Sequence, residues 1–173
     1  MARRPLTRSD IERLAREYDA APDIADPDTC PPMWHAYGVH ALERQRKLAD
    51  GFTIYFVSVS DPYAHGSELL SDLVQGQYKV PAPTACPAHP TWDGSVYSAS
   101  RTWHDIEGHG FAGVGFTLDE EVRTFKMQAE QLREASLEEL ICVVFSDTMQ
   151  QLASTLYNRT FAPQKVLLTE HTK

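Results

Sequence analysis

A six-residue stretch of this 173-residue chain holds four side chains that can bind a metal ion or move a proton: His104, Asp105, Glu107 and His109. Neutral imidazole and carboxylate groups suit zinc, iron or manganese, whereas calcium prefers oxygen ligands alone. The composition of the stretch therefore predicts a site for a divalent metal ion. Zinc is the first expectation, with iron and manganese as alternatives.

The spacing of the two histidines is unusual for a helix. They are five residues apart, and residues that share a helix face are normally three or four apart. Five residues turn an ideal helix by about 500°, which is about 140° from alignment. Both rings can still face one ion if the helix contains a one-residue π-bulge, or if the helix ends before His109. Gly108 and Gly110 make either geometry accessible.

A carboxylate on the next predicted helix completes the candidate site. Glu121 lies twelve residues after His109, beyond a glycine-rich connection that permits a tight return of the chain. A helix-loop-helix hairpin would bring Glu121 back to the two imidazoles. The predicted metal ligands are therefore His104, Asp105, His109 and Glu121. Asp105 has an alternative role, since a carboxylate often orients a metal-binding imidazole from outside the ligand set.

Three further polar side chains are the candidate catalytic residues: Asp147, Glu107 and Gln151. Asp147 and Gln151 are four residues apart on one face of an otherwise apolar helix. Burying a carboxylate without a partner is costly, so Asp147 either faces solvent or pairs with a cation or a hydrogen-bond donor. As a functional residue it could be a further metal ligand or a general base. On a regular helix Glu107 points away from the histidines, which favours a solvated surface position over a role in the site.

The elements that must position these residues are mainly helical. Apolar periodicity and N-cap residues predict a single compact helical domain. Thr117 with Glu120, and Ser136 with Glu139, each fit the capping-box pattern at a helix start. One short strand, or a hairpin, is expected near 52–60, where β-branched and aromatic residues gather. The expected helices cover residues 9–18, 33–50, 67–74, 93–106, 118–134 and 136–158.

Two segments are expected to lack regular structure. Residues 1–8 are predicted to form a mobile tail. Residues 79–93 contain four prolines and are predicted to form a loop. Such a loop is long for a compact connector, so it is either functional or a cover over a site. The remaining residues form one domain.

Composition excludes several classes of partner. The chain carries 24 acidic against 16 basic residues, a net charge of −8, without the basic patch of a nucleic-acid binder. No apolar run reaches the roughly 20 residues that span a bilayer, and no signal-peptide core follows the N-terminus. A cytoplasmic location is expected. The three distant cysteines, Cys30, Cys86 and Cys142, form no CxxC pair and predict neither a disulfide framework nor a thiolate zinc site.

The ligand pattern resembles a known family motif. His104-Asp105, then His109, then eleven residues and Glu121 is similar to the metal-ligand motif (HDxxH-x11-E) of the fourth Coq protein of ubiquinone biosynthesis, a mainly helical zinc-site family. That family has two residues between the aspartate and the second histidine, and this chain has three. The resemblance covers 18 residues and implies a metal site with these four ligand candidates. The segment is also similar to uncharacterised proteins of actinobacteria and their phages.

Three functions follow as hypotheses. The first is a metal-dependent enzyme, of the hydrolase, lyase or oxygenase-like kind, acting on a small organic substrate under the proline-rich segment. The second is an HD-type phosphohydrolase, with His104-Asp105, Asp147 and either His65 or His89 as ligands. The third is a non-catalytic domain whose metal holds two helices together. The expected partner is a small-molecule substrate, and a homodimer is an open alternative.

Overall fold

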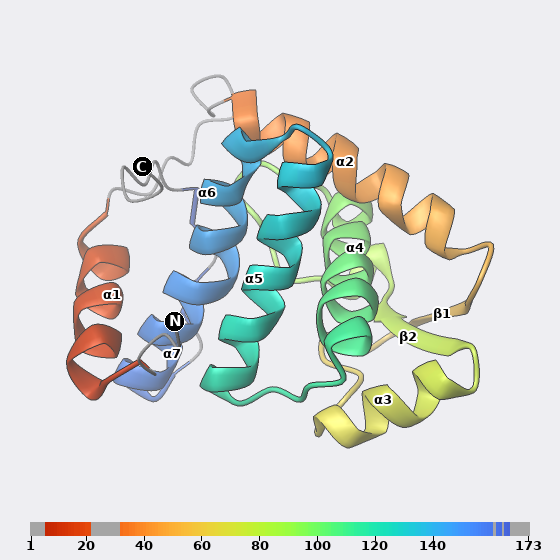
Figure 1. Ribbon diagram of the computed structural model, residues 1–173, viewed down its shortest axis with the longest axis horizontal. Coiled ribbons are helices and arrows are strands. Elements are labelled where there is room, and N and C mark those ends of the chain that lie inside the picture. Colours follow the sequence, from red (N-terminus) through yellow and green to blue (C-terminus); the bar gives the residue numbers. More distant parts are fainter. Residues whose placement is uncertain (1–5, 22–31, 161, 164, 167–173) are drawn as a thin grey trace.

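The computed structural model describes residues 6–21, 32–160, 162–163 and 165–166. The fold is mainly α-helical with one small sheet, as the sequence predicted (Figure 1). Two π-helical segments, His104–Gly110 (η3) and Phe145–Gln150 (η5), interrupt the later helices. The helices are α1 (Arg8–Ala20), α2 (Pro32–Leu48), α3 (Gly66–Val74), α4 (Gly94–Trp103), α5 (Leu118–Glu134), α6 (Ile141–Val144) and α7 (Gln151–Asn158), and the strands are β1 (Thr53–Val57) and β2 (Gln77–Pro81).

Helix α1 begins earlier than the sequence indicated. The Thr7 side chain accepts a hydrogen bond from the backbone N–H of Asp10, and the Asp10 carboxylate accepts from the backbone N–H of Thr7 at 2.8 Å. This capping box satisfies amide groups that the first helical turn leaves without partners. Thr7 and Arg8 therefore belong to the helix start and not to the tail expected over 1–8. Residues 1–5 of that tail lie outside the described residues.

The predicted strand forms, and its partner decides the local topology. β1 pairs in parallel with β2, in the register Thr53↔Gln77 to Val57↔Pro81, and α3 connects the two strands. A parallel pair needs such a crossover, so the strand is not part of a hairpin. β2 takes the first three residues of the segment that was expected to be a loop over 79–93. Pro81 is tolerated because it ends the strand.

The rest of the proline-rich segment is anchored to the helical core. A short 3-10 turn, η2 (Pro83–Ala85), follows β2. The Cys86 thiol lies 3.3 Å from the Ser98 hydroxyl of α4. The His89 ring stacks on Trp92 at 4.1 Å between centroids. Cys86 and Cys142 are both free thiols, as expected, and Cys30 lies outside the described residues.

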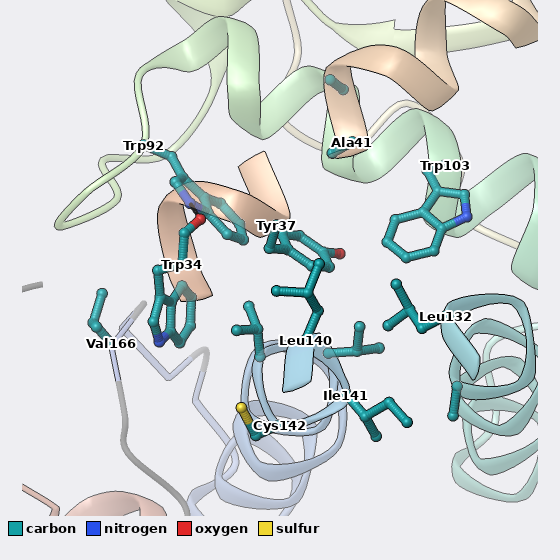
Figure 2. Packing of buried hydrophobic residues seen from close by; sticks show 14 of the residues in the cluster. Trp34, Tyr37, Ala41, Trp92, Trp103, Leu132, Leu140, Ile141, Cys142 and Val166 are labelled. Atoms are coloured by element: carbon teal, nitrogen blue, oxygen red, sulfur yellow. Dashed lines mark hydrogen bonds between the residues drawn. The ribbon is translucent and has the colours of Figure 1, made fainter. Parts of the chain in front are cut away.

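Aromatic side chains build the largest hydrophobic cluster of the described residues (Figure 2). Tyr37 of α2 stacks on Trp92 with 5.2 Å between the ring centroids, and the Trp92 indole N–H donates to the Trp34 carbonyl at 3.1 Å. Trp103 at the end of α4 lies in the same cluster, against Tyr37. Leu140, directly before α6, packs in the same cluster, so the cluster includes the start of the last helical segment. This cluster holds α2, α4, α5 and α6 together.

A second, smaller hydrophobic cluster lies under the sheet. Tyr78 and Val80 of β2 pack there with Leu69 of α3 and with Ile106, which belongs to η3. All four side chains are fully buried. Trp103 and Ile106 are three residues apart, so α4 and η3 together connect both clusters. The segment that carries the candidate ligands is therefore held from two sides.

The two predicted capping boxes have different outcomes. Thr117 and Glu120 form theirs, with the Thr117 backbone N–H donating to the Glu120 carboxylate at 3.0 Å. The box expected at Ser136 and Glu139 does not form. Ser136 has a φ of 56°, in the left-handed region that ends α5, and the chain re-enters a helix through the 3-10 turn η4 (Glu138–Leu140). Among the described residues, no helix combines the length and apolar character needed to cross a membrane.

The partly buried His89 ring predicts a measurable pH dependence of stability. Burial lowers the pKa of His89 to about 3, from an unfolded value near 6.5. Because the unfolded chain then binds the extra proton, the free energy of unfolding should fall as the pH drops below about 6.5. At pH 5 we expect the loss to be about 1–2 kcal/mol.

His89→Asn supplies the matched control. The backbone N–H groups of Thr91 and Trp92 donate to His89 Nδ1 at 3.2 and 3.1 Å, and the asparagine carbonyl can accept them without titrating. Urea unfolding between pH 7 and pH 5 should show a shallower decline for the variant. Identical slopes in both proteins would contradict the prediction.

Candidate metal centre

A π-helical turn brings His104 and His109 to the same side of their helix. η3 spans both residues, so the first of the two irregular geometries expected from the sequence is the one that forms. The extra residue in the turn compensates for the misalignment that five-residue spacing gives in a regular α-helix. The two Nε2 atoms lie 3.1 Å apart, and the rings meet edge to face with 4.8 Å between centroids.

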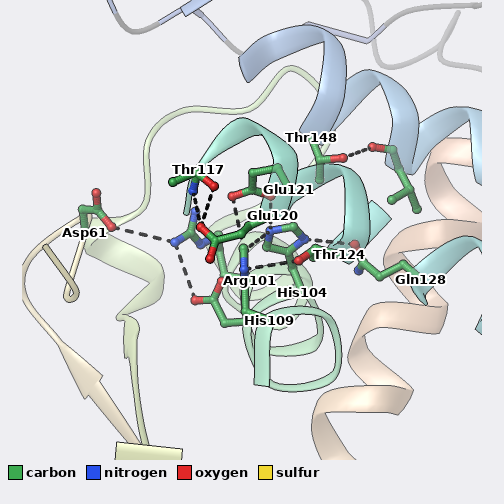
Figure 3. A network of polar contacts seen from close by, with 12 residues as sticks. Asp61, Arg101, His104, His109, Thr117, Glu120, Glu121, Thr124, Gln128 and Thr148 are labelled. Atoms are coloured by element: carbon green, nitrogen blue, oxygen red, sulfur yellow. Dashed lines mark hydrogen bonds and ion pairs between the residues drawn. The ribbon is translucent and has the colours of Figure 1, made fainter. Parts of the chain in front are cut away.

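Glu121 reaches this histidine pair from the first turn of α5. Its Oε1 lies 3.3 Å from His109 Nε2, and its Oε2 lies 3.4 Å from His104 Nε2 (Figure 3). One ligand atom from each of the three residues lies within 4.8 Å of the other two. The hairpin expected from the sequence therefore brings together the two imidazoles and the carboxylate. This group could hold a metal ion.

Helix α5 also supplies the groups that orient the two rings. Gln128 Oε1 accepts a hydrogen bond from His104 Nδ1 at 2.9 Å, and Thr124 Oγ1 lies 3.2 Å from His109 Nδ1. With Nδ1 engaged in this way, the Nε2 atom of each ring faces the shared centre. Sequence reasoning assigned no role to Thr124 or Gln128. The available signal was the seven-residue spacing that places Gln128 on the same face of α5 as Glu121.

Electrostatics couple the three side chains. Burial disfavours the charge on Glu121, but its hydrogen bonds and charge interactions with His104 and His109 prevail and bring its pKa far below the usual range. Burial likewise opposes protonation of His104, and the hydrogen bond and negative charge of Glu121 outweigh it and raise the pKa of that imidazole. An ion at this position would replace the shared proton. Metal binding is therefore expected to release protons.

The predicted ligand Asp105 lies outside this group. The Tyr78 hydroxyl donates to Asp105 Oδ2 at 2.8 Å, and the nearest Arg101 nitrogen lies 3.6 Å from the same oxygen. Asp105 is almost fully buried, on the side of η3 that faces the sheet. It links the segment to β2 and to Arg101.

Glu107 is buried, contrary to the solvated position that the sequence favoured. Its carboxylate forms an ion pair with Arg44 of α2. Only 3% of Glu107 is exposed. The ion pair joins η3 to α2 and places this carboxylate outside the His104, His109 and Glu121 group.

Asp147 and Gln151 line a cavity beside the group. The cavity has a volume of about 160 Å³ and also exposes His104 and Glu121. Burial raises the pKa of Asp147 to about 6, and its Oδ1 atom has no hydrogen-bond partner. The Gln151 side chain donates to the Ala162 carbonyl at 2.9 Å, so it also anchors the chain that follows α7.

A second cavity opens on the other side of the group. Its volume is about 310 Å³, and all three candidate ligands line it, together with Arg101 and Asp61. No residue of the segment 79–93 lines either cavity. His65 lies at the start of α3 and His89 in the aromatic cluster. Neither belongs to the His104 group.

Comparisons of the chain with protein-family models, with curated proteins and with solved structures find no match. The geometry of the group and the chemistry of its side chains are therefore the features that indicate a function.

Close packing between η3 and α5 yields a test of this geometry. A Cβ atom added at Gly108 would lie 2.4 Å from Thr124 Cγ2, far inside van der Waals contact. Gly108→Ala should therefore push α5 away from η3 and lower the free energy of unfolding by about 1–3 kcal/mol. Elemental analysis of the variant should also show less bound metal.

Thr124→Ser provides the compensating change. It removes the methyl group that an alanine at position 108 would strike and keeps the hydroxyl beside His109. The Gly108→Ala/Thr124→Ser double variant should recover most of the stability lost in Gly108→Ala, with Thr124→Ser alone as the reference. A double variant as unstable as Gly108→Ala would show that the loss has another origin.

Proposed function

We propose that this protein binds one divalent metal ion through His104, His109 and Glu121 and uses it to catalyse a reaction of a small organic substrate. The observation that carries the proposal is the convergence of the three ligand atoms within 4.8 Å from two different elements, η3 and α5. Buried imidazoles that are oriented through Nδ1 are the usual arrangement of histidine ligands.

The donor set supports a choice of metal. Two imidazoles and one carboxylate bind zinc in catalytic sites, and the same set with open positions binds ferrous iron in oxygenases. Zinc is our first proposal, followed by iron and manganese. A bound ion would supply Lewis acidity, and with iron also oxygen chemistry, so a hydrolase, a lyase and an oxygenase-like enzyme are the candidate classes.

The surroundings of the group favour an enzyme over a structural site. Structural zinc sites are usually closed by four protein ligands, whereas catalytic sites keep a position open for water or substrate. Here all three ligands border the larger cavity, and His104 and Glu121 also border the smaller one. In the smaller cavity Asp147 has a free buried oxygen and a pKa near neutrality, which suits a group that accepts a proton from a bound water or substrate. Gln151 would shape the same wall.

The alternatives remain separate hypotheses. The HD-type phosphohydrolase needs a further histidine at the ion, and neither His65 nor His89 belongs to the group. Manganese-dependent turnover of phosphodiesters or nucleotides would favour it nevertheless. The relationship to the fourth Coq protein and a cytoplasmic location also stay predictions, as do a homodimer and the absence of nucleic-acid binding.

Ligand substitutions test the metal proposal directly. His109→Ala and Glu121→Gln should each reduce stoichiometric metal by at least tenfold and leave the helical circular dichroism intact, since most of the core lies away from these side chains. The measurement is elemental analysis of protein purified without a histidine tag. His35→Ala and Asp119→Asn, exposed residues on α2 and α5, are the matched controls. Full metal content in His109→Ala would remove that residue from the ligand set.

Chelation separates an enzyme site from a structural metal. The two hydrophobic clusters pack independently of any ion, so removing the metal should lower the melting temperature only modestly. A metal that merely holds helices together contributes folding energy outright, and its removal would unfold the domain. Thermal melts by circular dichroism, with and without a chelator, distinguish the two. Unfolding on chelation would favour the non-catalytic alternative.

A further inference from the structure

Among the described residues, Arg101 is the one arginine that lines both cavities beside the candidate metal ligands. It lies on α4, three residues before His104, so the two side chains project from neighbouring positions on one helix face. Figure 3 shows its guanidinium near the histidine pair and linked to Asp61. The guanidinium therefore borders the same space as the open side of the metal group.

Two acidic residues near Arg101 stabilise its positive charge but do not form short hydrogen bonds with its N–H groups. The nearest oxygens of Asp105 and Asp61 lie 3.6 and 3.8 Å from an Arg101 nitrogen, beyond ordinary hydrogen-bond length. Its buried Nε has no hydrogen-bond partner. A guanidinium has five N–H groups in a planar fork that matches a carboxylate or a phosphate. Several of these groups are thus available to a ligand.

Two buried residues, Tyr78 and Asp105, hold this guanidinium in position. The Tyr78 hydroxyl, from β2, donates to Asp105 Oδ2, the same oxygen that attracts Arg101. Asp105 is buried, whereas Asp61 is largely exposed and contributes less because solvent screens it. Tyr78 and Asp105 therefore act as positioning residues for Arg101. This arrangement gives Asp105 a role in the site other than metal binding.

The charge balance of the larger cavity favours an anionic ligand. With a divalent ion in place, Glu121, Asp105 and Asp61 would carry three negative charges, and the ion and Arg101 would carry three positive ones. Solvent screens Asp61, whose side chain is 75% exposed, so the charges nearest the ion have a positive balance. Asp61 faces the cavity from its exposed rim, and Phe116, Ala64 and Leu152 give the remaining wall an apolar character. Asp147 lines the smaller cavity and is absent from this one. A small molecule with one anionic group and a short apolar body fits this lining.

We propose that the larger cavity binds a small oxyanion-bearing molecule, a carboxylate or a phosphate, with its anionic group on the Arg101 guanidinium and an oxygen on the metal. The inference rests on the proposed function, because the second contact needs the ion. The inference narrows the proposed substrate class from small organic molecules to small anions. Arg101 would contact substrate, and it would fix the orientation of the reacting group relative to the metal.

Anion titration of cobalt-substituted protein tests the inference. Cobalt(II) takes the place of zinc and reports on its ligands by visible absorption. Acetate and inorganic phosphate are the two probes, so the preferred probe identifies the chemical class. We expect at least one probe to change the spectrum saturably. Arg101→Gln should weaken that binding by about 10- to 100-fold. Arg101→Lys should weaken it by less, since lysine keeps the positive charge but lacks the planar set of N–H donors of the guanidinium.

Matched variants control for indirect effects. Arg123→Gln removes an exposed arginine from α5 and should bind the probes as the wild type does. Arg101→Gln leaves Asp105 buried without its cation, so the double variant Arg101→Gln/Asp105→Asn covers the case in which the single variant is unstable. Asp105→Asn alone should weaken binding less than Arg101→Gln does, because the guanidinium remains but is held less firmly.

The outcomes distinguish this inference from the metal proposal. Cobalt content is measured first by elemental analysis, and a wild-type protein without cobalt would refute the proposed function and the metal contact of the ligand together. A cobalt-loaded protein that responds to neither probe would overturn the inference and leave the metal proposal standing. Unchanged binding in Arg101→Gln, or in the double variant, would likewise overturn it.

Discussion

The contact between one carboxylate and two imidazoles is the constraint on which the rest of the structure depends. Glu121 lies within 3.4 Å of both rings, and both imidazoles are buried. Groups of this kind are costly to bury unless each has a partner. The two elements that carry these residues, η3 and α5, must therefore pack together in a closely defined geometry. The π-helical turn of η3 and the first turn of α5 satisfy this requirement, and their close packing at Gly108 leaves no room for a side chain between them.

The same constraint accounts for the positions of the polar groups around the site. Thr124 and Gln128 lie one and two turns along α5 from Glu121, and each engages the outer nitrogen of one histidine. One face of a single helix therefore supplies the candidate carboxylate ligand and both orienting groups. Any change in the packing of α5 against η3 moves all three together. This coupling explains how a site built from few residues can be geometrically exact.

Two hydrophobic clusters hold the ligand-bearing segment in place. Trp103 anchors the end of α4 in the aromatic cluster, and Ile106 anchors η3 in the cluster beneath the sheet. Polar contacts complete the frame: Glu107 pairs with Arg44 of α2, and Asp105 bonds to Tyr78 of β2. Three of the acidic and histidine side chains meet at the centre, while Asp105 and Glu107 tie the segment to its neighbours. The small parallel sheet thus serves the site indirectly, by positioning Asp105 and Arg101.

The sequence by itself determined the helical class, most helix bounds and the three residues that converge, because apolar periodicity, N-caps and residue chemistry are local properties. It also restricted the histidine pair to two geometries. Tertiary packing decided the rest. Whether Asp105 and Glu107 face an ion or a partner helix depends on which elements surround η3, and residue spacing alone does not contain that information. The parallel partner of β1 and the hydrogen bond from His104 to Gln128 join residues 24 apart in sequence, and only the folded chain brings them into contact.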